Sequence, residues 1–204
     1  MAILIHAQSA APGEPQVPLE LQALNTGRDA RNRPAAELVC LAGSARRWAD
    51  TLPGQVVALA GSSRLVAVST TFGDLMVRFD GIYSSAGRRL FPPIRLGHPA
   101  AFLAVAPGSA TLLALTADGK LRVWDFATSG CLLETSVAPL LAPGGGGQPL
   151  RVAAARLASC GSPLVVLSNA HAYVHHAGLR CWMRVVDDAF PISQLTTSVA
   201  SAAP

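Results

Sequence analysis

The sequence predicts an all-β fold with about three propeller-like blades, which together form a partial propeller behind a disordered amino-terminal lead-in. Two observations carry this prediction. Beyond residue 37 the apolar runs are short and rich in Val and Leu, and they end at Gly, Pro, Ser or Asp, as strands separated by turns do. The chain also resembles itself at an offset of 46 residues, which is a period typical of propeller blades.

The composition fits a folded domain. The 204 residues are 50% hydrophobic, 5% aromatic and 14% charged, with 18 Gly and 15 Pro, which excludes a coiled coil, a collagen and a highly charged disordered chain. The net charge is +4, but the basic residues are scattered, so we expect no direct sequence-specific contact with nucleic acid. Turn residues interrupt each long uncharged stretch, so we expect no membrane span.

The chain divides into three parts. Residues 1–36 contain four prolines and no sustained hydrophobic period, and they are predicted to be a disordered lead-in. Residues 37–190 carry the strand pattern and form the predicted β domain. Residues 191–204 are predicted to be a flexible or truncated tail.

The internal repeat defines the predicted blades. Without gaps, Gln55 to Asp80 aligns with Ala101 to Phe126, with seven identities in 26 positions. A weaker third copy follows at an offset of 51, where Val165 and Val174 align with Ala114 and Val123. We therefore expect three similar units of three or four short strands each.

The second unit carries the signature of WD repeats. Gly97 and His98 precede it, Asp118 and Gly119 form its central turn, and Trp124 with Asp125 ends the next strand. A turn Asp with a following Gly suits a tight hairpin, because Gly accepts a positive φ. We assign Gly97, His98, Asp118 and Gly119 to holding the blade together.

The same strand contains the predicted partner-binding residues, Arg122, Trp124 and Asp125. Leu121 and Val123 alternate with Arg122 and Trp124, so the second pair is expected to point away from the core, towards solvent or a partner. Trp and Arg are also the residues favoured at protein interfaces.

Catalytic and metal-binding alternatives find little support in the sequence. The four Cys form no close pair, and the zinc hypothesis would have to rely on scattered ligands, namely His171, His175, His176 and Cys181. A hydrolase would need a nucleophile, a base and an orienting acid, for which Ser168, His171 and Asp187 can be named, but no nucleophile elbow accompanies them. We expect no enzymatic activity, no metal and no cofactor.

Several segments follow one another in a distinctive order. They are Leu38-Val39-Cys40 with Trp48, Gly87-Arg88-Arg89-Leu90-Phe91-Pro92-Pro93-Ile94, Leu115 to Gly119 with Val123-Trp124-Asp125, Ser136 to Ala142, and Gly161 to Ser168 with Ala172, Tyr173, Trp182 and Val185. In this order, residues 38–187 resemble the C-terminal domain of the Hira family of histone regulators, also described as Tup-like enhancer of split. One turn departs from the family, because Asn169-Ala170-His171 stands where an Asp-Gly-Lys type of turn is expected.

The resemblance implies a function. It implies a non-enzymatic assembly module of a nuclear histone chaperone complex that acts in replication-independent nucleosome assembly and in transcriptional regulation. The implied partners are the other subunits of that complex and further copies of the chain, with histones contacted only indirectly. Compared with the family, the amino-terminal WD propeller and the helical tail are missing, so a fragment is expected. The alternative is a generic WD-type β-propeller scaffold of another pathway.

Overall fold

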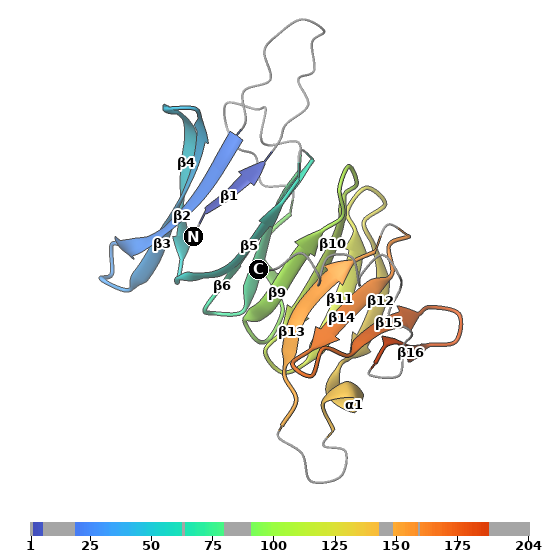
Figure 1. Cartoon of the computed structure of the whole chain (residues 1–204). Helices are drawn as coiled ribbons and strands as arrows, with labels where there is room; N and C mark the ends of the chain where they lie inside the picture. The colour runs from blue at the N-terminus through green and yellow to red at the C-terminus, as the bar shows by residue number, and fades with distance from the viewer. Residues whose placement is uncertain are drawn as a thin grey trace, which may run out of the picture.

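The computed structural model describes residues 2–5, 19–62, 64–79, 91–142, 149–158 and 160–187. In this part of the chain, sixteen strands form four four-stranded antiparallel sheets, and each sheet follows the chain as a simple meander. The four sheets lie side by side in chain order, as neighbouring blades of a propeller do (Figure 1). The first strands of neighbouring sheets contact one another, as the inner strands of propeller blades do.

We number the sheets 1 to 4 along the chain. Sheet 1 contains β1 (Ala2–Ile5), β2 (Leu19–Arg28), β3 (Pro34–Ala42) and β4 (Ala45–Pro53). Sheet 2 contains β5 (Val56–Gly61), β6 (Leu65–Thr70), β7 (Asp74–Phe79) and β8 (Ile94–Arg95). Sheet 3 contains β9 (Ala100–Val105), β10 (Thr111–Thr116), β11 (Lys120–Asp125) and β12 (Gly130–Ser136). The short helix α1 (Ala138–Leu141) leads to sheet 4, which contains β13 (Val152–Leu157), β14 (Pro163–Leu167), β15 (Ala172–His176) and β16 (Cys181–Val186).

The hydrophobic core lies in three layers, one between each pair of neighbouring sheets. Sheets 2 and 3 are therefore covered on both faces. Their second strands, β6 and β10, are almost completely buried along their length. A strand buried on both faces needs apolar residues at successive positions, which explains the runs Leu65 to Val68 and Leu112 to Leu115.

The predicted repeat is confirmed. Strands β6 and β7 coincide with β10 and β11 at the offset of 46 residues, and both pairs have the same length. At the offset of 51 residues, β10 and β11 coincide with β14 and β15. The repeated sequence unit is thus the central hairpin of each sheet.

The amino-terminal part of the structure differs in two respects from what the sequence indicated. Four sheets are present where the sequence indicated about three, and residues 2–5 and 19–36 belong to sheet 1 rather than to a disordered lead-in. The boundary at residue 37 falls inside β3. Leu19, Leu21 and Ala23 alternate along β2 and are buried against sheet 2, so tertiary burial stabilises a strand whose local signal is weak.

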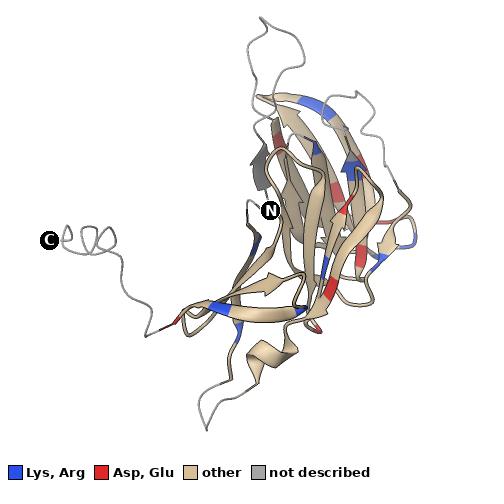
Figure 2. Ribbon diagram, turned by 90° about the vertical axis from the view of Figure 1, so that its right-hand side faces the viewer, with Lys and Arg blue, Asp and Glu red and all other residues tan. Residues whose placement is uncertain are grey.

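Residues 6–18 and the predicted tail, 191–204, lie outside the described residues. Within the described part, no helix has the length and apolarity that a membrane crossing requires. Basic and acidic residues are dispersed over the strands and turns of the described part of the chain (Figure 2).

Candidate partner-binding site

The blade motif is assembled around the carboxylate of Asp118, in the turn between β10 and β11. The Thr116 hydroxyl donates a hydrogen bond to Asp118 Oδ1 at 2.5 Å, and Lys120 Nζ lies 3.4 Å from Oδ2. His98 Nε2 lies 3.9 Å from the same Oδ2. The hydrogen bond from Thr116 is the main reason why the pKa of Asp118 is lowered. The hydrogen bond from Lys120 and the charge of His98 lower it further.

The two glycines of the motif occupy turns that other residues adopt only with strain. Gly119 has a φ of +85°, and Gly97 has a φ of +92°. Gly119 also holds the end of the blade, because its carbonyl accepts the backbone N–H of Val137 at 2.9 Å. The structure therefore places all four residues of the predicted blade motif in and around one end of sheet 3.

The three predicted partner-binding residues lie together on β11, and each already has a contact within the blade. The Arg122 guanidinium pairs with Glu134 of β12 at 2.9 Å, and this contact lowers the pKa of Glu134. The ring of Trp124 lies 6.3 Å from the ring of Phe126. The carboxylate of Asp125 accepts hydrogen bonds from the turn that follows, at 2.9 and 3.0 Å.

The predicted alternation along β11 is present, but its second face does not point straight to solvent. Leu121 and Val123 are buried between sheets 3 and 4, as expected. Trp124 is half-buried and packs on the layer between sheets 2 and 3. The alternation along β11 predicted that only one face of sheet 3 is covered. In the structure, sheets 2 and 4 cover both of its faces.

The exposed part of this region lies on β12, which is an edge strand. Leu132 sits where the register between β11 and β12 shifts, beside Trp124, and its side chain is 58% exposed. We define the β12 edge patch as Arg122, Trp124, Leu132 and Glu134. Leu132 and Glu134 could not be named from the sequence, because only the pairing of β11 with β12 brings them beside Arg122 and Trp124.

The residues named for zinc do not form a cluster. Among the described residues, no three His, Cys, Asp or Glu side chains are placed to share a metal ion. His175 is buried against Trp182, with ring centroids 5.2 Å apart, and burial lowers its pKa. The ring of His171 hydrogen-bonds Asn169 at 3.0 Å, and His176 Nδ1 accepts the N–H of Leu179 at 3.0 Å.

The residues named for a hydrolase have structural contacts. The hydroxyl of Ser168 accepts the backbone N–H of Arg151 at 3.2 Å, which ties the start of β13 to the end of β14. Asp187 pairs with Arg184 at 2.9 Å. These contacts stabilise the ends of sheet 4.

A family model described as Hira, TUP1-like enhancer of split, matches residues 87–203. Protein HIRA from Oryza sativa is 31% identical over 214 residues, covering 98% of this chain and 21% of the relative. Protein HIRA from Xenopus laevis is 33% identical over 150 residues, covering 73% of this chain and 14% of the relative. The chain thus spans about a fifth of the rice protein.

Solved structures show the same fold. A crystal structure of a HIRA fragment matches with a TM-score of 0.64 at 24% identity, covering 92% of this chain and 52% of that one. The WD40 repeats of RRP9 match with a TM-score of 0.53 at 13% identity, covering 80% of this chain and 56% of that one. The four sheets are therefore WD40-like blades, arranged as part of a propeller.

Proposed function

The chain belongs to the Hira family, and from this membership we propose that it is a protein-interaction and assembly module of a Hira-type histone chaperone complex. The proposed role is non-enzymatic and nuclear, in replication-independent nucleosome assembly and transcriptional regulation. The match of the family model to residues 87–203 is the observation that carries this proposal. The proposed partners are other subunits of the complex and further copies of the chain, with histones contacted only through them.

We propose the β12 edge patch, together with Asp125, as the surface that contacts a partner subunit. Trp and Arg contribute most to binding when a partner covers them, and Leu132 adds an exposed apolar side chain beside them. Arg122 is held by Glu134, so its guanidinium is already oriented before a partner arrives. Asp125 is assigned the supporting role, because its carboxylate shapes the turn next to Trp124.

The second candidate is a WD-type scaffold of another pathway. The likeness to the WD40 repeats of RRP9 favours it, because that likeness extends to 80% of the chain at only 13% identity. A shared fold alone does not determine the partner.

A pull-down from nuclear extract tests the proposal. The purified chain, Trp124→Ala and Leu132→Asp serve as baits, and Leu24→Asp is the matched control, since Leu24 is an exposed leucine on sheet 1. Far-UV circular dichroism and urea unfolding establish that each variant is folded. We expect the parent and the control to retain Hira-complex subunits, identified by mass spectrometry, and both patch variants to lose them.

Two outcomes would contradict the proposal. If the folded parent retained no Hira-complex subunit, the scaffold function would be the better explanation. If all four baits retained the subunits equally, the chaperone assignment would stand and the β12 edge patch would be wrong.

A further inference from the structure

Phe72 is an exposed aromatic residue in the turn between β6 and β7. Although it lies in a turn, 46% of its surface stays accessible while one edge of its ring is held in place. That edge lies on Gly54, in the link between β4 and β5, so closely that a Cβ on Gly54 would come within 2.9 Å of the ring. Gly54 also has a φ of +79°, which glycine adopts without strain. The ring is therefore fixed on one side and open to solvent on the other.

The turn between β2 and β3 carries an excess of positive charge. Residues 28–33 include three Arg and one Asp, a net charge of +2. The Asp29 carboxylate accepts the backbone N–H groups of Arg31 and Arg33, and it pairs with the Arg33 guanidinium at 2.8 Å. Arg28 Nη1 donates at 2.9 Å to a backbone carbonyl of the same turn, which has no charge to neutralise it. Internal hydrogen bonds thus order the turn, and its positive charges outnumber its single carboxylate.

Hydrogen bonds join this turn to the neighbourhood of Phe72. The backbone N–H of Gly54 donates at 3.0 Å to the carbonyl of Pro34, directly after the charged turn. Near the base of the turn, the Asn25 side chain exchanges two hydrogen bonds with the backbone of Val56, at 2.8 and 2.9 Å. The arginines and Phe72 are therefore held at the same end of sheets 1 and 2.

The acidic residues near Phe72 are already paired. Asp74, two residues further along the chain, pairs with Arg95 at 2.9 Å. In the charged turn, Asp29 is taken up by Arg33. The net charge beside the exposed ring is therefore positive. We define the Arg–Phe patch as Arg28, Arg31, Arg33 and Phe72.

We propose that the Arg–Phe patch binds an acidic segment of a partner protein that also carries an apolar side chain. The apolar side chain covers the open side of the Phe72 ring, and the carboxylates pair with Arg28 and Arg31. Aromatic residues and Arg contribute most to binding at protein interfaces, and a planar guanidinium binds a carboxylate through two parallel hydrogen bonds. Complementary charge adds specificity and speeds association. The inference does not depend on the proposed function, whose test uses residues of sheet 3.

The extent of the patch favours a protein segment over a nucleic acid. A nucleic-acid backbone is bound by several cations that follow its track, whereas this patch draws its cations from one turn. A short segment with a few carboxylates and one apolar side chain matches that extent.

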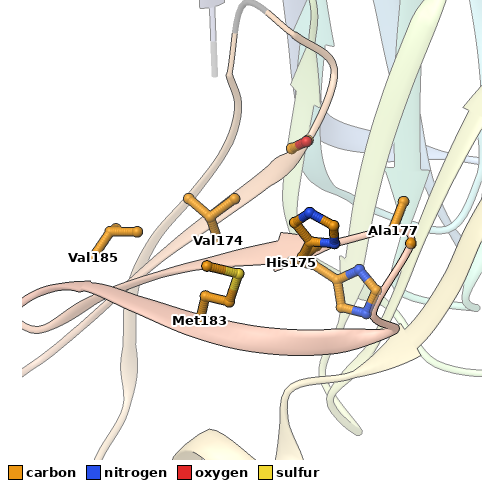
Figure 3. Close-up of a pocket in the computed structure, with 8 residues that line it drawn as sticks. Val174, His175, Ala177, Met183 and Val185 are labelled. Carbon is orange, nitrogen blue, oxygen red and sulfur yellow. The ribbon is translucent and has the colours of Figure 1, made fainter.

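A second exposed apolar surface has to be separated from this patch. On sheet 4, a pocket of about 370 Å³ is lined by Val174, Met183 and Val185, which all face it (Figure 3). Met183 is 43% exposed, so an apolar side chain of a peptide can reach it. This pocket serves as the control surface.

Fluorescence anisotropy on the full chain tests the proposal. The probe is a labelled peptide of sequence Glu-Asp-Leu-Phe-Glu-Asp, titrated with roughly 1 µM to 1 mM protein. The comparison probes are the same peptide with Lys in place of each acidic residue, and a labelled oligothymidine. The test variants are Arg31→Glu and Phe72→Ser. The matched controls are Met183→Ser and Arg64→Glu, since Arg64 is an exposed arginine in the turn at the opposite end of sheet 2. Urea unfolding establishes that every variant is folded.

We expect the parent and both controls to bind the acidic probe, and to bind it less tightly as the salt concentration rises. Arg31→Glu and Phe72→Ser should each weaken binding by about tenfold, since the first reverses a charge and the second removes the aromatic contact.

Several outcomes would overturn the proposal. These are no saturable binding by the parent, equal binding of the acidic and the Lys probes, and test variants that bind like the parent. Loss of binding only in Met183→Ser would assign the probe to the pocket on sheet 4 instead. Tighter binding of oligothymidine that Arg31→Glu abolishes would assign the patch to nucleic acid rather than to a protein segment.

Discussion

Arg78 joins sheet 2 to sheet 1, and its replacement is the sharpest test of how the sheets are held together. Its side chain is only 6% exposed on β7. The guanidinium pairs with the carboxylate of Asp50 on β4 and stacks on the ring of Trp48, 4.6 Å from the ring centroid. At the offset of 46 residues, Arg78 occupies the position that Trp124 holds in sheet 3, so an ionic contact stands where sheet 3 has an aromatic one.

The expected effect of Arg78→Met follows from these contacts. Removing one partner of a buried ion pair lowers the free energy of unfolding by about 3 to 5 kcal/mol. The carboxylate of Asp50 is 26% exposed, so water partly solvates it after the substitution, and Met refills most of the space of the Arg stem. The low end therefore applies, and we expect a loss of about 3 kcal/mol, which includes the contact with Trp48. For a domain of this size the melting temperature should fall by roughly 6 to 12 °C.

Urea unfolding followed by circular dichroism and tryptophan fluorescence measures this loss. Arg95→Met is the matched control, because Arg95 is 67% exposed and pairs with Asp74 at the surface. An exposed ion pair of this kind contributes less than about 1 kcal/mol. A double-mutant cycle of Arg78→Met with Asp50→Asn then isolates the coupling between the two side chains. If Arg78→Met unfolded within about 0.5 kcal/mol of the parent, the argument that this buried pair joins the sheets would be refuted.

Three further predictions concern turns, pH and the contact between sheets 3 and 4. Gly73→Ala should destabilise the chain by about 2 to 3 kcal/mol in urea unfolding, because φ is +75° and the added Cβ would lie 3.0 Å from the backbone carbon of His98. Gly108→Ala, with a φ of +68° and open space around the new Cβ, should lose only about 1 kcal/mol, and equal losses would show that the close approach is unimportant. Burial lowers the pKa of His175 below its ordinary value of 6.5, so the unfolded state takes up its proton first. The contribution of His175 to the free energy of unfolding should therefore be constant above about pH 7 and should fall as the pH drops below 6.5. When urea midpoints are compared at about pH 7.5 and 5.5, the fall should be smaller for His175→Phe than for the parent. Trp182→Phe removes an indole N–H that donates at 2.9 Å to the backbone carbonyl of Ser136 on β12. We expect the free energy of unfolding to fall by about 1 kcal/mol, and an unchanged urea midpoint would argue that this hydrogen bond does not join sheets 3 and 4.

The sequence indicated only part of the candidate site, namely its residues on β11, and it indicated their geometry incompletely. Trp124, Asp125 and Arg122 were named from a spacing, and they do lie together on β11. Their orientation could not be read from alternation, because alternation separates two faces without indicating what covers each. Leu132 was missed because its position depends on a register shift between two strands, which no pattern within β12 indicates.

The sequence by itself determined the family, the repeat and the central hairpins of sheets 2 to 4. These features rest on short-range chemistry, such as a Gly with positive φ after a turn residue and apolar runs long enough for one strand. Only the tertiary structure decided that residues 19–36 belong to sheet 1, that Trp124 packs between blades, and that Arg78 pairs with Asp50 and stacks on Trp48. The physical reason is that each of these depends on the apolar surface that a neighbouring sheet offers, and that surface comes from residues distant in the chain.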